Sequence, residues 1–225
     1  MKKAVVLLSG GLDSAVTAFL ARKDIGKRGG LYALTLDYGQ VHSRELSSAE
    51  RIAKVLEVEE FREEYLTIPC ESALTSGVQG AIRVSGVELG IPETWVPQRN
   101  SVFLALAFAY AEGVGADWVY IGVNSIDYSG YPDCRSEFVA AMNKALNLAS
   151  KRYVETGRGI GIVTPLMHKR KSEIVQLGVK LGVPFGLTTS CYFGGERACG
   201  VCDACRIRLE AFRKVGIGDP IPYKE

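Results

Sequence analysis

The sequence predicts an α/β fold, in which a Rossmann-like parallel sheet carries helices on both faces and a small cysteine-rich region follows at the C-terminus. Two observations carry this prediction. Short apolar runs alternate with helical segments along most of the chain, an order typical of a parallel sheet that is covered on both faces. Four of the six cysteines then lie within residues 191–205. We therefore expect a main domain over residues 1–185 and a small appended region over residues 186–225.

The first part of the chain alternates strands with helices. An apolar run at residues 4–8 predicts a strand, and the alanine, leucine and phenylalanine side chains of residues 15–21 predict a helix that follows it. A second apolar run at residues 31–36 precedes a helix over residues 43–56, which Ser43 can cap. A third strand is predicted at 61–66.

A long stretch without periodicity separates this part from the next. Residues 69–97 are rich in Ser, Thr, Gly and Pro, and a connection of this length is typical of an active-site lid or substrate loop. Residues 101–111 are apolar at nearly every position, so we expect a helix that is buried on all sides. The remaining segments alternate again, with strands at 118–123 and 160–164 and helices at 136–151, 171–181 and 204–214.

Composition and charge favour a small-molecule partner and a cytoplasmic location. The chain is 47% hydrophobic and 23% charged, with a net charge of +2, so it lacks the strong positive field that suits nucleic acid. The N-terminal apolar run has five residues. A secretory signal needs roughly seven to fifteen apolar residues and a spanning helix about twenty. We therefore expect no membrane partner.

The stretch Ser9-Gly10-Gly11-Leu12-Asp13-Ser14 joins the first strand to the first helix. The first N–H groups of a helix have no partner within it, and the macrodipole is positive there, so this position suits a phosphate. The glycines let an anion approach the backbone, and Asp13 can cap the helix or hold a magnesium ion. The stretch has neither the lysine of a P-loop nor the third glycine of a dinucleotide motif, so a tight turn without a ligand stays open.

The spacing C-x7-C-x2-C-x2-C joins Cys191, Cys199, Cys202 and Cys205. Intervals of two residues bring thiolates to one tetrahedral ion, and the longer loop returns the fourth ligand. Four sulfur ligands with no open position predict a structural zinc site that activates no water. An iron–sulfur cluster and four reduced thiols stay open as alternatives.

Residues 124–135 are expected to determine substrate specificity. They follow a predicted strand, and α/β proteins bind their ligands at the carboxyl ends of the strands. The carboxylates of Asp127 and Asp133 can accept hydrogen bonds from a guanine-like base, and the ring of Tyr131 can stack on it. Arg135 can pair with a substrate carboxylate through a bidentate fork. The same composition also suits a solvated turn.

Two cationic positions adjoin predicted elements. Arg99 precedes the apolar helix and would project from its N-terminal end. The run His168-Lys169-Arg170-Lys171 comes after a predicted strand. A basic run is usually a solvated face, but one member that faces a phosphate would supply the lysine missing from the opening loop.

The opening loop resembles the pyrophosphate loop of the ATP pyrophosphatases, which cleave ATP between its α- and β-phosphates. Almost the whole chain resembles the 7-cyano-7-deazaguanine synthase family. The motifs that carry this resemblance are Asp-Tyr-Gly-Gln-Val-His-Ser at 37–43, Val-Pro-Gln-Arg-Asn at 96–100, Asp-Tyr-Ser-Gly-Tyr-Pro-Asp-Cys-Arg at 127–135, Thr-Pro-Leu-Met at 164–167 and the four cysteines. The family commonly has glycine where this chain has Gln98. The backbone conformation at this position, and with it the direction of the Arg99 side chain, therefore depends on this substitution.

The resemblance implies a fold like the adenine nucleotide alpha hydrolases and a ligase that makes 7-cyano-7-deazaguanine, a queuosine and archaeosine precursor. The substrates would be 7-carboxy-7-deazaguanine, ammonia and ATP, with release of AMP and pyrophosphate. It also implies ATP and Mg²⁺ at residues 9–14, catalytic roles for Asp13, Lys171 and Arg99, the acid near residues 127–135, structural zinc, and a homodimer without direct nucleic-acid contact.

Two other functions stay open on the sequence. One is another pyrophosphate-loop enzyme, such as a tRNA-thiolating or amide-forming synthetase. The other is a zinc-stabilised RNA-binding module, which the near-neutral charge disfavours.

Overall fold

The computed structural model describes residues 1–39, 44–70, 72, 91, 95–126 and 131–224. Their parallel sheet has the strand order β3-β2-β1-β4-β5. The strands are β1 (Lys3–Leu7), β2 (Gly30–Asp37), β3 (Glu60–Tyr65), β4 (Trp118–Tyr120) and β5 (Gly161–Val163). The predicted α/β fold with a parallel sheet is confirmed.

The helices occupy the connections between and after these strands. They are α1 (Leu12–Ile25), α2 (Arg44–Leu56), α3 (Arg99–Val114), α4 (Ser136–Leu148), α5 (Lys151–Thr156), α6 (Lys171–Leu181) and α7 (Asp203–Val215), with short 3-10 turns η1 (Pro132–Cys134) and η2 (Phe185–Leu187).

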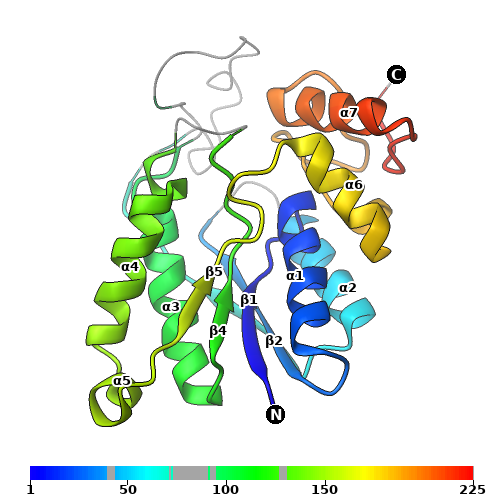
Figure 1. Cartoon of the computed structure of the whole chain (residues 1–225). Helices are drawn as coiled ribbons and strands as arrows, with labels where there is room; N and C mark the ends of the chain where they lie inside the picture. The colour runs from blue at the N-terminus through cyan, green and yellow to red at the C-terminus, as the bar shows by residue number, and fades with distance from the viewer. Residues whose placement is uncertain (40–43, 71, 73–90, 92–94, 127–130, 225) are drawn as a thin grey trace.

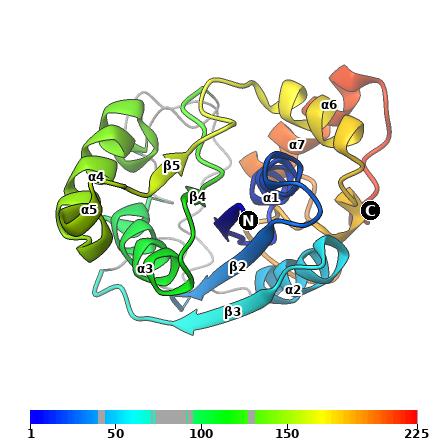
Figure 2. The same cartoon turned by 60° about the horizontal axis from the view of Figure 1, so that its bottom comes forward.

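Helices cover both faces of the sheet, as predicted. Figures 1 and 2 show α1 and α2 on one side of the strands and α3 and α4 on the other. Successive side chains of a strand point to opposite faces. Val6 of β1 therefore packs in the core beneath α1 and α2, whereas Val5 packs in the core beneath α3 and α4. Both are fully buried, so the central strand is held from two sides.

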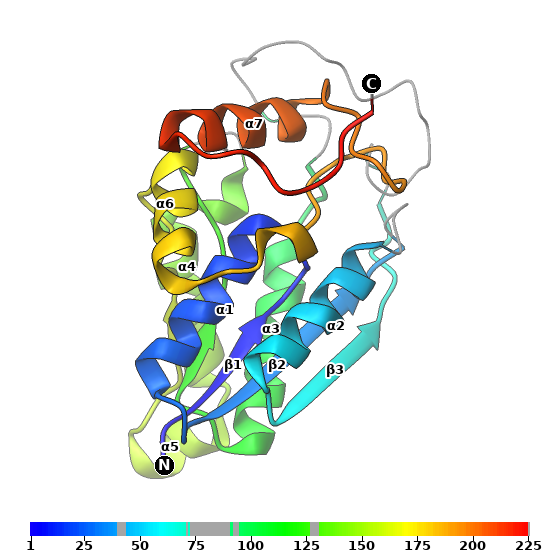
Figure 3. The same ribbon diagram turned by 90° about the vertical axis from the view of Figure 1, so that its right-hand side faces the viewer.

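The C-terminal region lies against the helices that follow the sheet. α7 packs on α6, and Figure 3 shows α7 lying across one end of that helix. Phe212 of α7 belongs to the core beneath α1 and α2. Cys202 and Cys205, at the opposite end of α7 from Phe212, belong to a third, smaller apolar cluster.

α3 is less buried than the sequence predicts. Leu104 and Ala107 are fully buried against the sheet, but Val102 and Leu106 are each 36% exposed. One side of the helix covers the strands, whereas the opposite side faces outward with apolar side chains. The expectation that this helix is buried on all sides is therefore wrong.

Two other predicted elements differ in their bounds. The helix expected over residues 136–151 is divided into α4 and α5, because the Ser150 hydroxyl caps α5 by accepting from the Tyr153 N–H at 3.3 Å and donates to Glu112 at 2.8 Å. β4 ends at Tyr120, earlier than predicted. The cap expected at Ser43 and most of the lid expected over residues 69–97 lie outside the described residues.

Candidate active site

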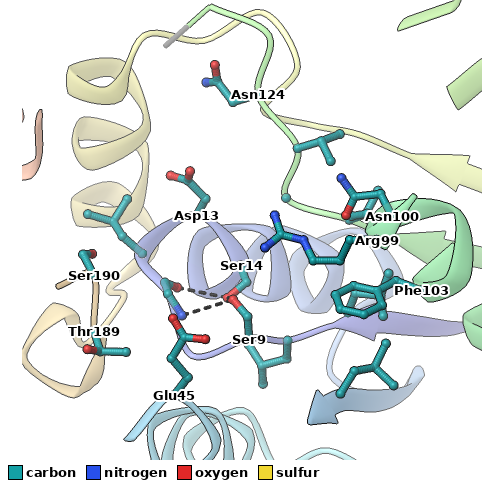
Figure 4. A pocket seen from close by; sticks show the side chains of 18 of the residues that line it. Ser9, Asp13, Ser14, Glu45, Arg99, Asn100, Phe103, Asn124, Thr189 and Ser190 are labelled. Carbon is teal, nitrogen blue, oxygen red and sulfur yellow. Dashed lines mark hydrogen bonds between the residues drawn. The ribbon is translucent and has the colours of Figure 1, made fainter. Parts of the chain in front are cut away.

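A cavity of about 320 Å³ lies at the carboxyl ends of the central strands. Its lining includes Ser9 after β1, Tyr38 after β2 and Asn124 after β4. The sheet order places β2 and β3 on one side of β1 and β4 and β5 on the other. Open α/β sheets bind their ligands where the strand order reverses in this way, so the cavity is the candidate active site (Figure 4).

The opening loop forms one wall of the cavity. Gly10 has a φ of +80°, and a Cβ there would lie 2.3 Å from the Glu45 backbone oxygen, so the close approach of α2 requires glycine. The Ser9 hydroxyl donates to Ser14 Oγ at 3.1 Å, and Ser14 Oγ donates to the Gly11 carbonyl at 3.0 Å (Figure 4). Gly11, the N-cap of α1, provides no side-chain cap. The start of α1 therefore has the form that an anion site requires.

An ion pair joins this loop to α6. Lys171, the first residue of α6 and 8% exposed, donates from Nζ to Asp13 Oδ2 at 2.6 Å. The other carboxylate oxygen, Asp13 Oδ1, is buried and has no hydrogen-bond partner in the described part of the chain. A buried carboxylate oxygen without a partner suits a cation, and oxygen is the ligand type that Mg²⁺ prefers. The lysine absent from the opening loop thus comes from a residue 158 positions away.

Gly122 brings the end of β4 against the same loop. A Cβ at this position would lie 3.1 Å from the carbonyl carbon of Asp13 and from the backbone nitrogen of Ser14. That distance is tighter than a side chain tolerates without a shift of backbone. The glycine therefore lets the chain after β4 reach the start of α1.

Arg99, the first residue of α3, lies in the opposite wall (Figure 4). Its Nη1 donates to the Tyr38 hydroxyl at 3.1 Å, and its guanidinium lies 5.7 Å from the centre of the Tyr38 ring. Burial alone would lower the pKa of Arg99, but the charge and hydrogen bond of Tyr38, with Tyr131 and Asp133, raise it above its ordinary value. The cavity therefore contains a permanent, half-buried cation.

Gln98 takes the backbone conformation that a glycine adopts freely. Its φ is +58°, in the left-handed region, which costs most residues about 1–2 kcal/mol. Its side-chain Oε1 accepts from the Ser101 hydroxyl at 2.7 Å. The left-handed backbone at this position explains why the family that the chain resembles commonly has glycine there. In this chain the contact with Ser101 partly offsets the strain.

The substrate residues predicted between 127 and 135 lie in different surroundings. Tyr131 lines the cavity. Asp133 is buried at the start of α3, where its Oδ2 accepts from the Asn100 N–H at 3.1 Å. Arg135 is exposed at the start of α4 and outside the cavity lining. Asp127 lies outside the described residues.

Cys134 lines the cavity but keeps its proton. Burial, together with the charge of Asp133, raises the pKa of its thiol to about 12. The Asn100 side-chain amide contacts its sulfur at 3.5 Å. Because the thiolate is the nucleophilic form of cysteine, this surrounding disfavours a sulfur-transfer role for Cys134.

Several residues that line the cavity were not predicted from the sequence. Glu45 is the one whose side chain is best suited to proton transfer. It lies in the first turn of α2, and burial raises the pKa of its carboxyl to about 7, although Arg99 opposes this rise. Its nearest sequence signal is the 37–43 motif just before it. Thr189 and Ser190 also line the cavity. The only sequence feature that could have indicated this is their position just before Cys191.

The four predicted cysteine ligands come together. Their sulfur atoms all lie within 4.8 Å of one another. Backbone N–H groups of Val201 and Cys202 donate to Cys199 Sγ at 3.4 and 3.3 Å, and the Cys199 N–H donates to Cys191 Sγ at 3.3 Å. A hydrogen bond from Cys205 lowers the pKa of the Cys202 thiol below its ordinary value. This set of donors fits a tetrahedral metal ion held by thiolates.

A buried arginine connects this cysteine cluster to the cavity. Arg208 of α7, 1% exposed, donates to Asp219 from Nε at 2.7 Å and from Nη2 at 2.9 Å. Its Nη1 donates to Thr188 Oγ1 at 2.7 Å and Ser190 Oγ at 3.2 Å. Between those two residues, the Thr189 N–H donates to the Gly10 carbonyl at 3.0 Å. The cysteine-rich C-terminal region thus supports the opening loop through one network.

In the described part of the chain, no helix is both long and apolar enough to span a bilayer.

Comparison with known proteins places these features in one family. The family model described as "Queuosine biosynthesis protein QueC" matches residues 3–216. The 7-cyano-7-deazaguanine synthase of Pseudomonas aeruginosa is 50% identical, with 99% of this chain and 98% of that protein covered. The enzyme of the same name from Nostoc sp. is 46% identical, with 98% and 97% covered. An NMN synthetase structure from Francisella tularensis has a similar fold, with a TM-score of 0.53, 20% identity, and 96% and 77% covered.

Proposed function

Because the chain belongs to the QueC family of 7-cyano-7-deazaguanine synthases, we propose that it converts 7-carboxy-7-deazaguanine and ammonia to 7-cyano-7-deazaguanine with two ATP. A carboxylate is a poor electrophile, since its leaving group would be an oxide. Adenylation replaces that group with AMP, and ammonia then gives an amide. Adenylation of the amide oxygen permits loss of a second AMP and formation of the nitrile.

One observation supports this proposal most strongly. The start of α1 lacks a side-chain cap, and beside it the 2.6 Å contact of Lys171 with Asp13 leaves Asp13 Oδ1 without a partner in the described residues. Departing pyrophosphate needs oriented N–H groups and cations where its charge develops. Residues 9–14 would hold the ATP phosphates, Asp13 would hold Mg²⁺, and Lys171 would contact the phosphates. Bound Mg²⁺ would neutralise charge on the leaving pyrophosphate.

The other wall of the cavity would hold the deazaguanine acid. Arg99 is a half-buried cation that can pair with a carboxylate, and the ring of Tyr131 can stack on a base. Asp133 would act through its contact with Asn100, by fixing the start of α3 and hence Arg99. We keep Asp127 and Arg135 as further substrate residues.

The C-terminal cluster would hold structural zinc. Four thiolates complete a tetrahedral coordination sphere, so the ion would organise residues 186–225 beside the main domain of residues 1–185 and would activate no water. Metal analysis of the purified protein tests the assignment. One zinc per chain supports it, whereas iron with acid-labile sulfide contradicts it.

We also propose a cytoplasmic homodimer that makes no direct contact with nucleic acid. ATP supply and reduced thiols favour the cytoplasm. The outward apolar side chains of Val102 and Leu106 on α3 offer surface that a second copy could bury. Light scattering gives the mass that tests the dimer.

Pyrophosphate release with separate acceptors tests the reaction class. The deazaguanine acid, glutamine and tRNA are each presented with ammonia and Mg·ATP, and we expect release with the acid. Release that depends on tRNA or on glutamine would contradict the proposed substrate. A Lys171→Met variant tests the proposed lysine in the same assay and should turn over more slowly. Lys54→Met, which alters an exposed lysine, is its control and should turn over like wild type.

A further inference from the structure

We propose that Glu45 is a catalytic residue that accepts the proton lost by the reacting nitrogen in each half of the reaction. The inference rests on the proposed function and concerns proton transfer, which that function requires but does not assign to a residue.

The first reason is the position of Glu45. It lines the cavity together with Ser9 and Arg99, and its carboxyl group points from α2 into that cavity (Figure 4). Its backbone oxygen lies 2.3 Å from where a Cβ of Gly10 would be, so the first turn of α2 rests directly on the opening loop. Because the adenylated carbonyl forms beside the loop, a group held there is close to the incoming nitrogen.

The second reason is the chemistry of both steps. In the first, the ammonia nitrogen forms a bond to the acyl carbon, the carbon–oxygen bond to AMP breaks, and AMP leaves with the electron pair. The new N–H₃⁺ group must then lose a proton to become an amide. In the second, adenylation on the amide oxygen leaves a C=NH₂⁺ group. This nitrogen loses one proton to give the imidate, and it loses the other as AMP leaves with the carbon–oxygen electron pair, so that the nitrile results. Each step therefore needs a proton acceptor near the same nitrogen.

The third reason is that several other titratable groups around the cavity suit this task poorly. Asp13 is paired with Lys171 at 2.6 Å. Tyr38 accepts from Arg99, and burial raises its pKa above its ordinary value. Cys134 holds its proton, and Tyr131 is a phenol beside a cation. Arg99 and Arg208 are permanent cations.

Burial also places Glu45 in the useful range. It raises the pKa of the carboxyl to about 7, against the opposing effect of Arg99. A carboxylate with this pKa is a better proton acceptor than an exposed one, and it is still ionised above neutral pH.

The test compares Glu45→Gln with wild type under ammonia and under hydroxylamine. Hydroxylamine is a much weaker base than ammonia, so its nitrogen, once bonded to the acyl carbon, loses its proton more readily and needs less help from a protein base. We expect Glu45→Gln to lower nitrile formation by about 10²- to 10⁴-fold. Acid-dependent pyrophosphate exchange into ATP, and hydroxamate formation, should each stay within about threefold of wild type. Glu50→Gln, on the exposed side of the same helix, is the matched control and should match wild type in every assay.

Three results would overturn the assignment. The first is an equal loss of hydroxamate and nitrile, which indicates that Glu45 supports folding or adenylation. The second is a raised Mg²⁺ requirement with full activity at saturating Mg²⁺, which indicates a metal ligand. The third is unchanged nitrile formation. Failure of the proposed function is distinct from these results, because wild type itself would then make no nitrile from the deazaguanine acid.

Discussion

The Arg208 network gives the sharpest prediction about stability. Arg208→Met keeps the apolar stem in α7 but leaves the Asp219 carboxylate, whose side chain is 2% exposed, without its cation. Removal of one partner from a buried ion pair costs about 3–5 kcal/mol. For a chain of this size each kcal/mol shifts Tm by roughly 2–4 °C. We therefore expect Tm to fall by about 6–20 °C.

A second variant separates the lost charge from the lost packing. Arg208→Met combined with Asp219→Asn removes the unpaired charge, while the asparagine oxygen can still accept from Tyr223, which now donates to Asp219 at 2.7 Å. Calorimetry of both variants should show that the double variant regains about half of the loss or more. The KM for ATP should rise in the single variant, because Thr189 holds Gly10 in place. A Tm within 2 °C of wild type for Arg208→Met, or a double variant no better than the single one, would refute the reasoning.

Four further variants test three separate parts of the structure. Cys202→Ser should lower bound metal and Tm together, since ligand assembly contributes folding free energy; retention of both values would contradict the metal site. Lys171→Met should reduce kcat by about 10²- to 10³-fold, because it removes a cation from the leaving pyrophosphate, and steady-state kinetics with less than a fivefold change would oppose that role. Gln98→Gly should change stability by less than about 1 kcal/mol, because relief of left-handed strain is offset by the lost Ser101 contact and by backbone entropy. Gln98→Val should destabilise the protein in the same denaturant titration, and equal stability of these two variants would argue against strain.

The sequence predicts the parallel sheet and the opening loop well, for a shared physical reason. Apolar runs that alternate with helices leave few arrangements other than a covered parallel sheet, and the carboxyl ends of its strands then converge at one edge. One member of the basic run at 168–171 could therefore be expected near residues 9–14, and the family resemblance singled out Lys171. The cysteine spacing likewise predicts that the four sulfurs lie together, and they do.

Other features depend on tertiary contacts that leave little trace in the sequence. An acidic residue in the first turn of an amphipathic helix, such as Glu45, ordinarily faces water near the positive end of the helix dipole. From the sequence, Arg208 cannot be distinguished from the exposed charged residues of α7, because its burial depends on the tertiary contact with Asp219. The outward side of α3 is apolar, so burial could not be distinguished from an exposed apolar face by composition alone.

Mass spectrometry of the reaction products tests the central claim most directly. The purified chain is incubated with 7-carboxy-7-deazaguanine, ammonia and Mg·ATP. The deazaguanine and nucleotide products are then identified by mass and quantified in the same sample. We expect 7-cyano-7-deazaguanine with two AMP for each nitrile, and a transient amide that carries nitrogen from ¹⁵N-ammonia. ADP as the sole nucleotide product, or AMP without any nitrile, would contradict the account.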